Sequence, residues 1–297
     1  MKTLTYAWGG APARGSLKVT PEDFIVREQL GFELAGTGEH QCLQIRKVGQ
    51  NTAWVSEHLA RYAGVRPFDV SYCGRKDRHA DTTQWFSVWL PGQPADWSDF
   101  ELEGTEILSV SLHDRKLRKG SHWGNEFVIT LRNLEGDSEA LKAVLQRISE
   151  QGFPNYFGSQ RFGREGQNIV MGEKLVRGER VPRNQRDMYL SALRSEMFNR
   201  CLSDQLSQGN LTPAERGWLY GSARKETPAL EQIAARWPAW CDFLTRMKMK
   251  AQLRDQMVVP RDLSWSLGED TLTLSFALPA GCYATSLIRE IVDFGES

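Results

Sequence analysis

Hydrophobic and polar residues alternate along several short segments of the first half of the chain, and this pattern predicts strands. In the segment 24–28, Phe24, Val26 and Glu28 share one face, and in 40–47 Leu43 and Ile45 lie on one side. Further strands are predicted at 69–73, 84–90, 106–112 and 126–131. Apolar residues at helical spacing predict helices from Asn51 to Gly64 and over 138–150.

The pattern changes after Phe153 and Pro154. Helical spacing dominates from about residue 167 to 256, with helices predicted at 188–206, 228–237 and 241–253. Beyond Pro260 alternation returns at 264–267 and 271–278, and a short helix is predicted near 284–294. Because such a short tail cannot bury a core of its own, we expect it to rejoin the first-half sheet. The sequence therefore predicts an α+β core interrupted by a mostly helical insertion.

Charge and composition narrow the function. The 297 residues include 37 Lys and Arg against 37 Asp and Glu. This balance disfavours a protein that binds polyanions over its whole surface, but it leaves room for a local basic groove. No apolar stretch approaches the roughly 20 residues that span a bilayer. The five cysteines form no C-x-x-C pair and the five histidines no H-E-x-x-H motif, so we expect reduced thiols, a cytoplasmic location and no metal site.

The segment from Gly74 to Gln84 is the most unusual stretch. It leaves a predicted strand through glycine and places four basic residues around the carboxylate of Asp77; these are Arg75, Lys76, Arg78 and His79. Neighbouring cations lower the pKa of a carboxyl group, which keeps it ionised as a nucleophile or base requires. The alternative is a charged hairpin loop in which Asp77 forms the turn.

Three other segments combine aromatic, amide and glycine residues. Asn125 and Phe127 open a predicted strand two residues apart, so their side chains share a face. The segment 154–163 holds three aromatic residues, an arginine and two glycines. In the segment 278–286, a glycine turn precedes Tyr283 at the start of a predicted helix.

Taken together, these segments resemble the TruD family of transfer-RNA pseudouridine synthases. The family's G-x-K-D-x-x-A-x-T-x-Q signature is matched by Gly74, Lys76, Asp77, Ala80, Thr82 and Gln84. Its N-Y-F-G-x-Q-R-F-G signature is matched by 155–163, its P-E-D-F element by 21–24 and its L-P-A-G-x-x-A-T-S element by 278–286. The four motifs occur in the family's order and span nearly the whole chain.

The resemblance implies a fold and a domain organisation. The fold is an α+β pseudouridine synthase core, with a mixed, mainly antiparallel sheet flanked by helices. The core is expected to comprise residues 1–150 and 259–297, and the family's inserted TRUD domain residues 151–258.

The resemblance also implies an activity. The family isomerises a tRNA uridine, normally the one at position 13, to pseudouridine without cofactor or metal; no protein partner is implied. Asp77 matches the catalytic aspartate, and Phe24, Asn125 and Tyr283 match positions that contact the target nucleotide. Tyr283 stands where a phenylalanine is familiar, so its hydroxyl needs a hydrogen-bond partner.

The chemistry assigns further roles. A uridine must leave the base stack before it can react, and Phe24, Phe127 and Tyr283 are candidates for stacking on bases; Phe24 and Phe127 are equally expected as plain core residues. Asn125 can pair with a uracil edge. Asp77 either attacks C1′ of the ribose or removes the C2′ proton, and both routes stay open. Lys18 is our candidate for an ion-pair partner that positions Asp77.

Basic residues are candidates for phosphate contacts. The run 113–119 contains Arg115, Lys116, Arg118 and Lys119, and Arg75 and Lys76 either hold phosphates or position Asp77. Phosphate contacts supply much of nucleic-acid affinity. The alternative for the run is an ordinary solvated face.

Two other functions are considered. The first is a non-catalytic RNA-binding protein or tRNA chaperone with the same groove, which would have no need for a lone acid in a basic cluster. The second, a nucleotide-binding enzyme or an aspartate-nucleophile hydrolase, is disfavoured because the sequence contains neither G-x-x-x-x-G-K-[ST] nor G-x-G-x-x-G after a strand.

Overall fold

The computed structural model describes residues 3–92, 94–209 and 215–295, and the remaining positions of the three predicted domains lie outside the described residues. By packing, the chain divides into two compact units. The sheet unit comprises Gly15–Glu135 and Pro260–Gly281. The helical unit comprises the residues up to Arg14, Gly136–Val259 and the residues from Cys282 onward.

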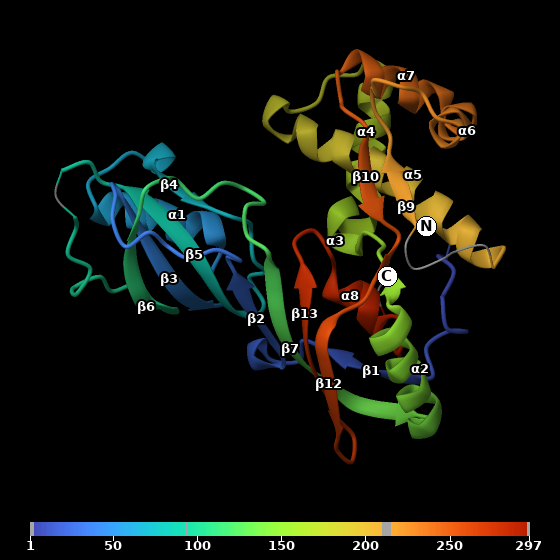
Figure 1. Cartoon of the computed structure of the whole chain (residues 1–297), viewed down its shortest axis with the longest axis horizontal. Coiled ribbons are helices and arrows are strands. Elements are labelled where there is room, and N and C mark those ends of the chain that lie inside the picture. Colours follow the sequence, from blue (N-terminus) through green and yellow to red (C-terminus); the bar gives the residue numbers. More distant parts are fainter. Residues whose placement is uncertain (1–2, 93, 210–214, 296–297) are drawn as a thin grey trace. The chain divides into compact units, whose positions relative to one another are not determined.

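The sheet unit is built on one mixed sheet (Figure 1). Its strands are β2 (Phe24–Gln29), β3 (His40–Val48), β4 (Val70–Tyr72), β5 (Asp81–Trp89), β6 (Thr105–His113), β7 (Gly124–Gly136), β12 (Arg261–Leu267) and β13 (Leu272–Pro279). They run in the order β12-β13-β7-β2-β5-β3-β6, with β4 paired to β5. β2 and β5 are parallel, whereas the other pairs along this order are antiparallel. The predicted mainly antiparallel sheet is confirmed.

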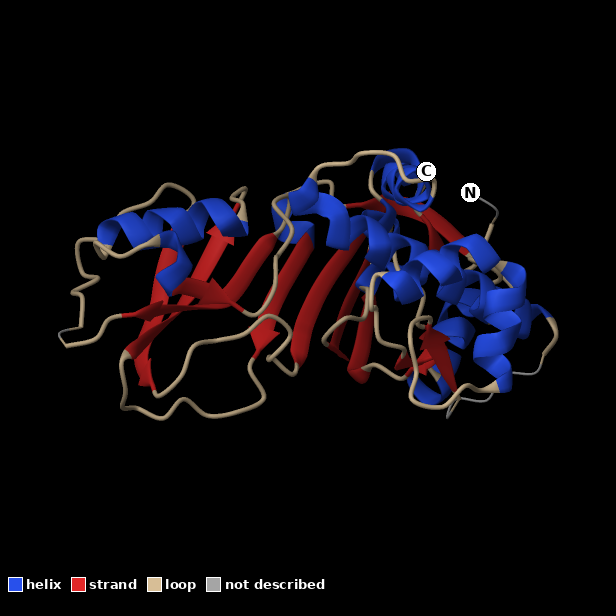
Figure 2. Ribbon diagram, turned by 90° about the horizontal axis from the view of Figure 1, so that it is seen from above, coloured by secondary structure: helices blue, strands red, loops and turns tan. Residues whose placement is uncertain are grey.

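A helix packs on part of this sheet, at the left of Figure 2. It is α1 (Thr52–Tyr62), which begins at Asn51, whose side chain accepts a hydrogen bond from Ala53 N. Its Val55 and Leu59 are fully buried against Leu43, Ile45 and other apolar strand residues. Two short 3₁₀ helices, η1 (Pro21–Asp23) and η2 (Pro67–Asp69), lead into β2 and β4. The alternation of β3 therefore supplies the face on which α1 packs.

Residues 261–279 of the C-terminal tail return to the sheet, as predicted, whereas the residues from Cys282 onward belong to the helical unit. β13 pairs with β7 from Leu272 opposite Leu131 to Pro279 opposite Gly124. Phe276 of β13 stacks on Phe127 of β7, with ring centroids 5.3 Å apart. These pairings place residues 261–279 in the same sheet as the first half of the chain.

The helical unit contains the predicted helices and several short strands. Its helices are α2 (Ser138–Gln151), α3 (Ser159–Phe162), α4 (Gln167–Val176), α5 (Arg186–Ser207), α6 (Pro228–Arg236), α7 (Pro238–Arg246) and α8 (Ala284–Ile288), with η3 (Arg164–Gly166) and η4 (Arg183–Gln185). Its strands are β8 (Phe153–Pro154), β9 (Arg216–Leu219), β10 (Gln252–Asp255), β11 (Met257–Val258) and β14 (Val292–Asp293). β1 (Ala13–Leu17) begins here and ends in the sheet unit.

Two predicted helices end early. The helix predicted at 241–253 stops at Arg246, because Lys248 adopts φ of +55° and Met249 N bonds back to Leu244 O. Residues 252–255 instead form β10, which pairs antiparallel with β9. The helix predicted near 284–294 stops at Ile288, and β14 follows it.

Residues distant in sequence meet in the helical unit. Ala13 and Arg14 of β1 pair in parallel with Val292 and Asp293 of β14. Tyr156 Oη donates to Thr5 O at 2.9 Å, and Ser286 Oγ donates to Tyr156 O at 2.9 Å. The unit thus combines three stretches of chain, including α2 and the residues after 281. The predicted domains at 1–150, 151–258 and 259–297 divide the chain by an insertion in the sequence, whereas the two units divide it by packing. The domain boundaries therefore stay a prediction.

The described residues contain neither a membrane-spanning helix nor a cluster of metal-binding side chains. None of the helices at 3–92, 94–209 and 215–295 is long and apolar enough to cross a membrane. In the same residues, no three His, Cys, Asp or Glu side chains gather as a metal site would require.

Candidate active site

The loop that carries Asp77 connects β4 to β5 in the sheet unit. Thr52, the first residue of α1, accepts a hydrogen bond from Lys76 N at 3.0 Å and donates to Gln84 Oε1 at 2.9 Å. Gln84 Nε2 in turn donates to Gly74 O at 3.2 Å. Thr52 and Gln84 are both buried, so the loop is fastened at Gly74 and Lys76, on the N-terminal side of Asp77.

Lys18, His79 and Lys47 each contact Asp77. Its Oδ2 forms an ion pair with Lys18 Nζ, and its Oδ1 accepts from His79 N at 3.1 Å. Its backbone carbonyl accepts from Lys47 Nζ at 3.1 Å. The side chain is 24% exposed, so Asp77 is mostly buried but remains accessible to a substrate. The predicted pairing of Lys18 with Asp77 is present in the structure.

The backbone of Lys18 is strained at this position. Its φ is +59°, in the left-handed region that non-glycine residues seldom adopt. Such strain costs about 1–3 kcal/mol and persists where the surroundings enforce it. The ammonium lies 4.2 Å above the centre of the Phe24 ring, so Lys18 brings the P-E-D-F element and the Asp77 loop together.

The electrostatics keep Asp77 ionised. Burial by itself would raise the pKa of the Asp77 carboxyl group, but the hydrogen bond and charge of Lys18, with the His79 N–H, outweigh burial and hold the pKa below its ordinary value. Lys47 is fully buried, and burial lowers the pKa of its ammonium to about 8. Asp77 is therefore a carboxylate at neutral pH.

Phe24 and Phe127 pack in the core of the sheet unit. They are 6% and 7% exposed, and their rings meet edge to face at 6.2 Å and 74°. Phe127 also stacks on Phe276. Both rings are core residues, which is one of the two roles that the sequence left open for them. Stacking of either ring on a base stays a prediction.

Asn125 contacts Lys76, the residue that precedes Asp77 in the sequence. Its Oδ1 accepts from Lys76 Nζ at 2.5 Å, and the same ammonium lies 2.8 Å from Glu28 Oε2. The Lys76 side chain is only 7% exposed. The charge of Lys76 is buried and paired inside the protein, and a phosphate contact by Lys76 stays a prediction.

The basic run lies against the strand that leads to Asp77. Gly120 N donates to Cys73 O at 2.7 Å, so Arg118 and Lys119 are close to the start of the loop and both are exposed, as is Arg75. Arg115 pairs with Asp114, and Lys116 Nζ donates to Phe68 O. Phosphate contacts by Arg75, Arg115, Lys116, Arg118 and Lys119 stay a prediction.

Tyr283 belongs to the helical unit. Arg161 Nε donates to its hydroxyl at 3.1 Å, and its ring meets Phe157 at 5.9 Å. The expectation that this hydroxyl needs a partner is confirmed, and the partner comes from the 155–163 motif. A contact between Tyr283 and the target nucleotide stays a prediction.

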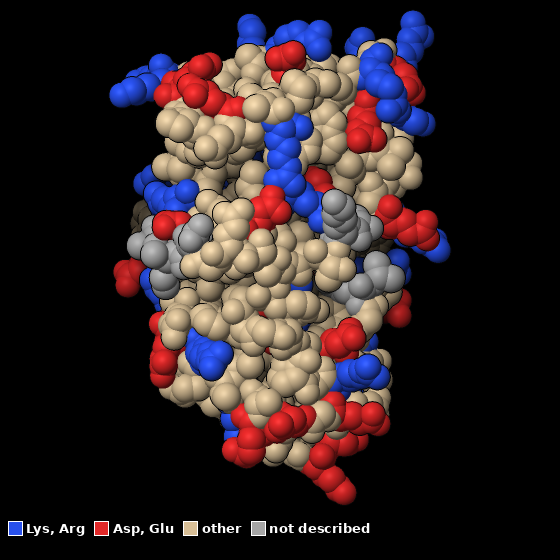
Figure 3. All heavy atoms as spheres, turned by 90° about the vertical axis from the view of Figure 1, so that its right-hand side faces the viewer, with Lys and Arg blue, Asp and Glu red and all other residues tan. Residues whose placement is uncertain are grey.

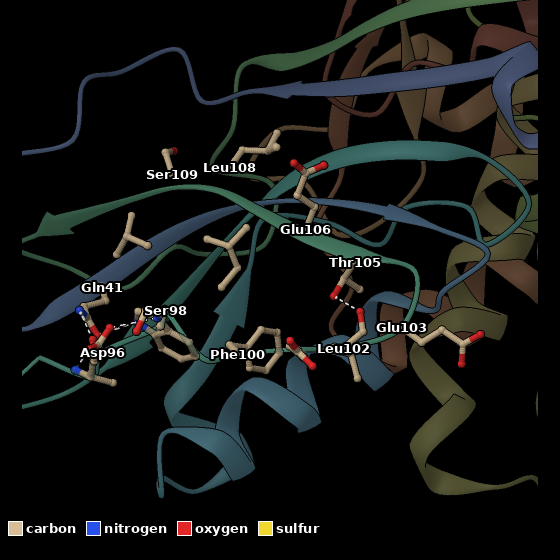
Figure 4. Close-up of a pocket in the computed structure, with 15 residues that line it drawn as sticks. Gln41, Asp96, Ser98, Phe100, Leu102, Glu103, Thr105, Glu106, Leu108 and Ser109 are labelled. Atoms are coloured by element: carbon tan, nitrogen blue, oxygen red, sulfur yellow. Dashed lines mark hydrogen bonds between the residues drawn. The ribbon is translucent and has the colours of Figure 1, made fainter.

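A separate hollow lies along β6 and the loop before it (Figure 4). It encloses about 1070 Å³ and is lined by Asp96, Glu101, Glu103 and Glu106 among other residues, with no Lys or Arg. Because carboxylates repel phosphates, this hollow does not fit RNA. On the face shown in Figure 3, basic and acidic side chains are interspersed, and no continuous basic surface forms there.

Glu28 and Lys47 are buried charged residues for which the sequence predicted no role. Both positions carried a signal. Glu28 shares the face of Phe24 and Val26, and Lys47 follows Leu43 and Ile45 on the buried side of an alternating strand. A charged residue on the buried side of a strand requires a partner. In the structure these partners are Lys76 for Glu28, and the carbonyls of Gln50 and Asp77 for Lys47.

Comparison with known proteins decides the family. The model of the family described as tRNA pseudouridine synthase D (TruD) matches residues 1–180. The chain belongs to the TruD family. It is 42% identical over 308 residues to the tRNA pseudouridine synthase D of Cellvibrio japonicus (strain Ueda107), covering 96% of this chain and 91% of the relative. It is 40% identical over 336 residues to that of Pseudoalteromonas translucida (strain TAC 125), covering 100% and 95%.

The TruD fold is also found in a solved structure. The chain resembles a protein from Methanosarcina mazei that carries the TruD name, with a TM-score of 0.69 and 19% identity, covering 96% of this chain and 95% of that one. At this identity the likeness concerns the fold. It confirms the predicted α+β pseudouridine synthase architecture for this TruD family member.

Proposed function

We propose that this protein is a tRNA pseudouridine synthase that isomerises the uridine at position 13, and that it works in the cytoplasm, where tRNA is found. The observation that carries the proposal is a mostly buried Asp77 kept ionised by Lys18 inside the family's signature. Relatives named tRNA pseudouridine synthase D support the substrate class.

The proposed reaction needs no outside reagent. The C1′–N1 bond breaks and a C1′–C5 bond forms, while C5 loses a proton and N1 gains one, so the composition of the nucleotide is unchanged. Asp77 initiates the exchange either by attacking C1′ or by removing the C2′ proton. Lys18 holds the carboxylate in place, and the exposed cations Arg75, Arg118 and Lys119 receive the RNA backbone.

The experiment that tests this function uses unmodified tRNA transcript. The protein is incubated with transcript in excess chelator, and pseudouridine is mapped by chemical reverse-transcription stops. We expect one new stop at position 13, and none in a matched transcript with cytidine there. No modification of any uridine would reject the enzyme and leave the non-catalytic RNA-binding protein, whereas modification elsewhere would reject only the position.

The pH dependence of the Lys18→Met variant tests the role of the ion pair. The reaction requires ionised Asp77, so activity is present above the pKa of this group and lost as pH falls through it. In the unaltered protein that loss lies below pH 3.8, the ordinary value for aspartate. Without Lys18, burial raises the pKa of Asp77, and the acid limb of kcat/KM moves upward into the measurable range. An acid limb that stays in place would contradict this role.

The salt dependence of Arg118→Ala tests the basic run. If Arg118 contacts a phosphate, its removal weakens tRNA binding and reduces the slope of log K against log salt by about 1. Lys142→Ala on α2 is the control, because Lys142 is exposed and already pairs with Glu139 at 2.7 Å. An unchanged slope for Arg118→Ala would make the run a solvated face.

A further inference from the structure

A buried ion pair touches the amide of Asn125. Glu28 on β2 and Asn125 on β7 are direct partners across the two strands. Lys76 reaches both, with Nζ 2.8 Å from Glu28 Oε2 and 2.5 Å from Asn125 Oδ1. The Glu28 side chain is fully buried, and its Oε1 accepts from Trp85 N at 3.1 Å. Glu28 is thus fixed by the sheet, and it fixes the ammonium in turn.

This arrangement determines which end of the Asn125 amide meets the ammonium group of Lys76. An ammonium group only donates hydrogen bonds, so it must face the amide oxygen and not the NH₂ group. Asn125 itself is half-buried. Among the hydrogen bonds of the described residues none uses its Nδ2, so the NH₂ group is available to a ligand and can only donate.

In the proposed reaction, a hydrogen-bond donor beside the base can bind uracil both before and after the base turns. Before the new bond forms, the detached uracil must turn about its N3–C6 axis, which exchanges N1 with C5 and C2 with C4. Both C2 and C4 of uracil carry carbonyl oxygens, so an NH₂ group beside either position meets an acceptor before and after the turn. Cytosine carries a carbonyl at C2 and an amine at C4, so one of its two orientations sets amine against amine.

We propose that Glu28, acting through Lys76, locks the Asn125 amide as a donor and so selects a base with carbonyls on both sides of N3. Glu28 and Lys76 are positioning residues, and Asn125 is the specificity-determining residue. The inference rests on the proposed function, because it assumes that a uridine enters beside Asp77.

Asn125→Asp tests the direction of the hydrogen bond. The aspartate has the shape of asparagine and pairs well with Lys76, but it offers the base only acceptors. We expect the single-turnover rate on tRNA transcript to fall about 10- to 100-fold with unchanged tRNA binding. Asn133→Asp is the matched control, since it makes the same change on the same strand at an exposed position. A rate for Asn125→Asp within twofold of the unaltered protein would overturn the proposal.

The double variant Glu28→Gln/Lys76→Met tests the positioning role. It removes both charges together, so no unpaired charge is left buried, and glutamine keeps an oxygen for Trp85 N. The measurement compares transcripts that carry uridine, 2-thiouridine or 4-thiouridine at the target position, because sulfur accepts hydrogen bonds poorly. The unaltered protein should react about tenfold more slowly with each thio base, and in the double variant the ratio should shrink towards 1.

The positioning role and the isomerase activity can be disproved separately. A merely structural role for Glu28 and Lys76 would slow all three transcripts equally and leave the ratio unchanged, which would overturn the inference while the isomerase stands. If the unaltered protein fails to convert uridine at all, the proposed function falls, and the inference falls with it.

Discussion

Asp77→Asn will bind unmodified tRNA at least as tightly as the unaltered protein but will form pseudouridine at least about 10³-fold more slowly. An amide neither attacks C1′ nor removes a proton, and a positioned acid–base group alone contributes about 10²–10⁴-fold. Binding survives because the change removes a negative charge from the basic segment 75–79 and leaves the cations proposed to meet phosphates in place. Single-turnover conversion and filter binding measure the two effects on one preparation.

The control for Asp77→Asn is Asp96→Asn. Asp96 is an aspartate of the same unit that accepts from Ser98 N at 3.0 Å in an exposed loop, so the substitution makes the same change in charge away from Lys18. We expect the control to retain full activity. Activity of Asp77→Asn within tenfold of the unaltered protein would remove the carboxylate from the mechanism, whichever of the two routes is considered.

Asn199→Leu will destabilise the helical unit by about 3 kcal/mol. Asn199 on α5 is fully buried, and its amide bonds twice to one residue, accepting from Phe157 N and donating to Phe157 O, both at 2.9 Å. Leucine would fill the space but leave a buried N–H and a buried carbonyl without partners, each of which costs about 1–3 kcal/mol. Denaturant unfolding followed by circular dichroism measures the loss.

Ser207→Ala is the comparison on the same helix. Ser207 is exposed and its hydroxyl donates to Asp204 O, one turn away on the same helix, so we expect a change below about 0.5 kcal/mol. If Asn199→Leu cost no more than this, the contact with Phe157 would not hold the 155–158 segment in place.

Much of the sheet could be predicted from local pattern. Leu43 and Ile45 alternate because one side of β3 faces α1, and the same rule placed the tail strand that pairs with β7. The end of α7 could not be predicted in this way. Residues 252–255 form a strand because they hydrogen-bond with 216–219, and no pattern within 252–255 reports a partner more than thirty residues away.

Some residues of the candidate site could likewise be predicted from local sequence, and others could not. Asp77, Asn125 and Phe24 could be found because they stand in motifs, and the attraction between Lys18 and Asp77 follows from opposite charge. The role of Lys76 could not be found, because a lysine in a basic loop is equally able to point at solvent. Only the register of β2 against β7, which sets Glu28 opposite Asn125, directs that ammonium inward.

Because the helical unit gathers residues 3–14, 136–209, 215–259 and 282–295, its order of assembly during translation is constrained. The ribosome releases Thr5 long before the strand that pairs with β1 and the helix that carries Ser286. Until then Tyr156 and its apolar neighbours lack part of their cover. Contacts over such long sequence separations form slowly, so these aromatic residues stay partly exposed in a nascent chain until residues 282–295 have been made, and exposed apolar surface of this kind favours aggregation.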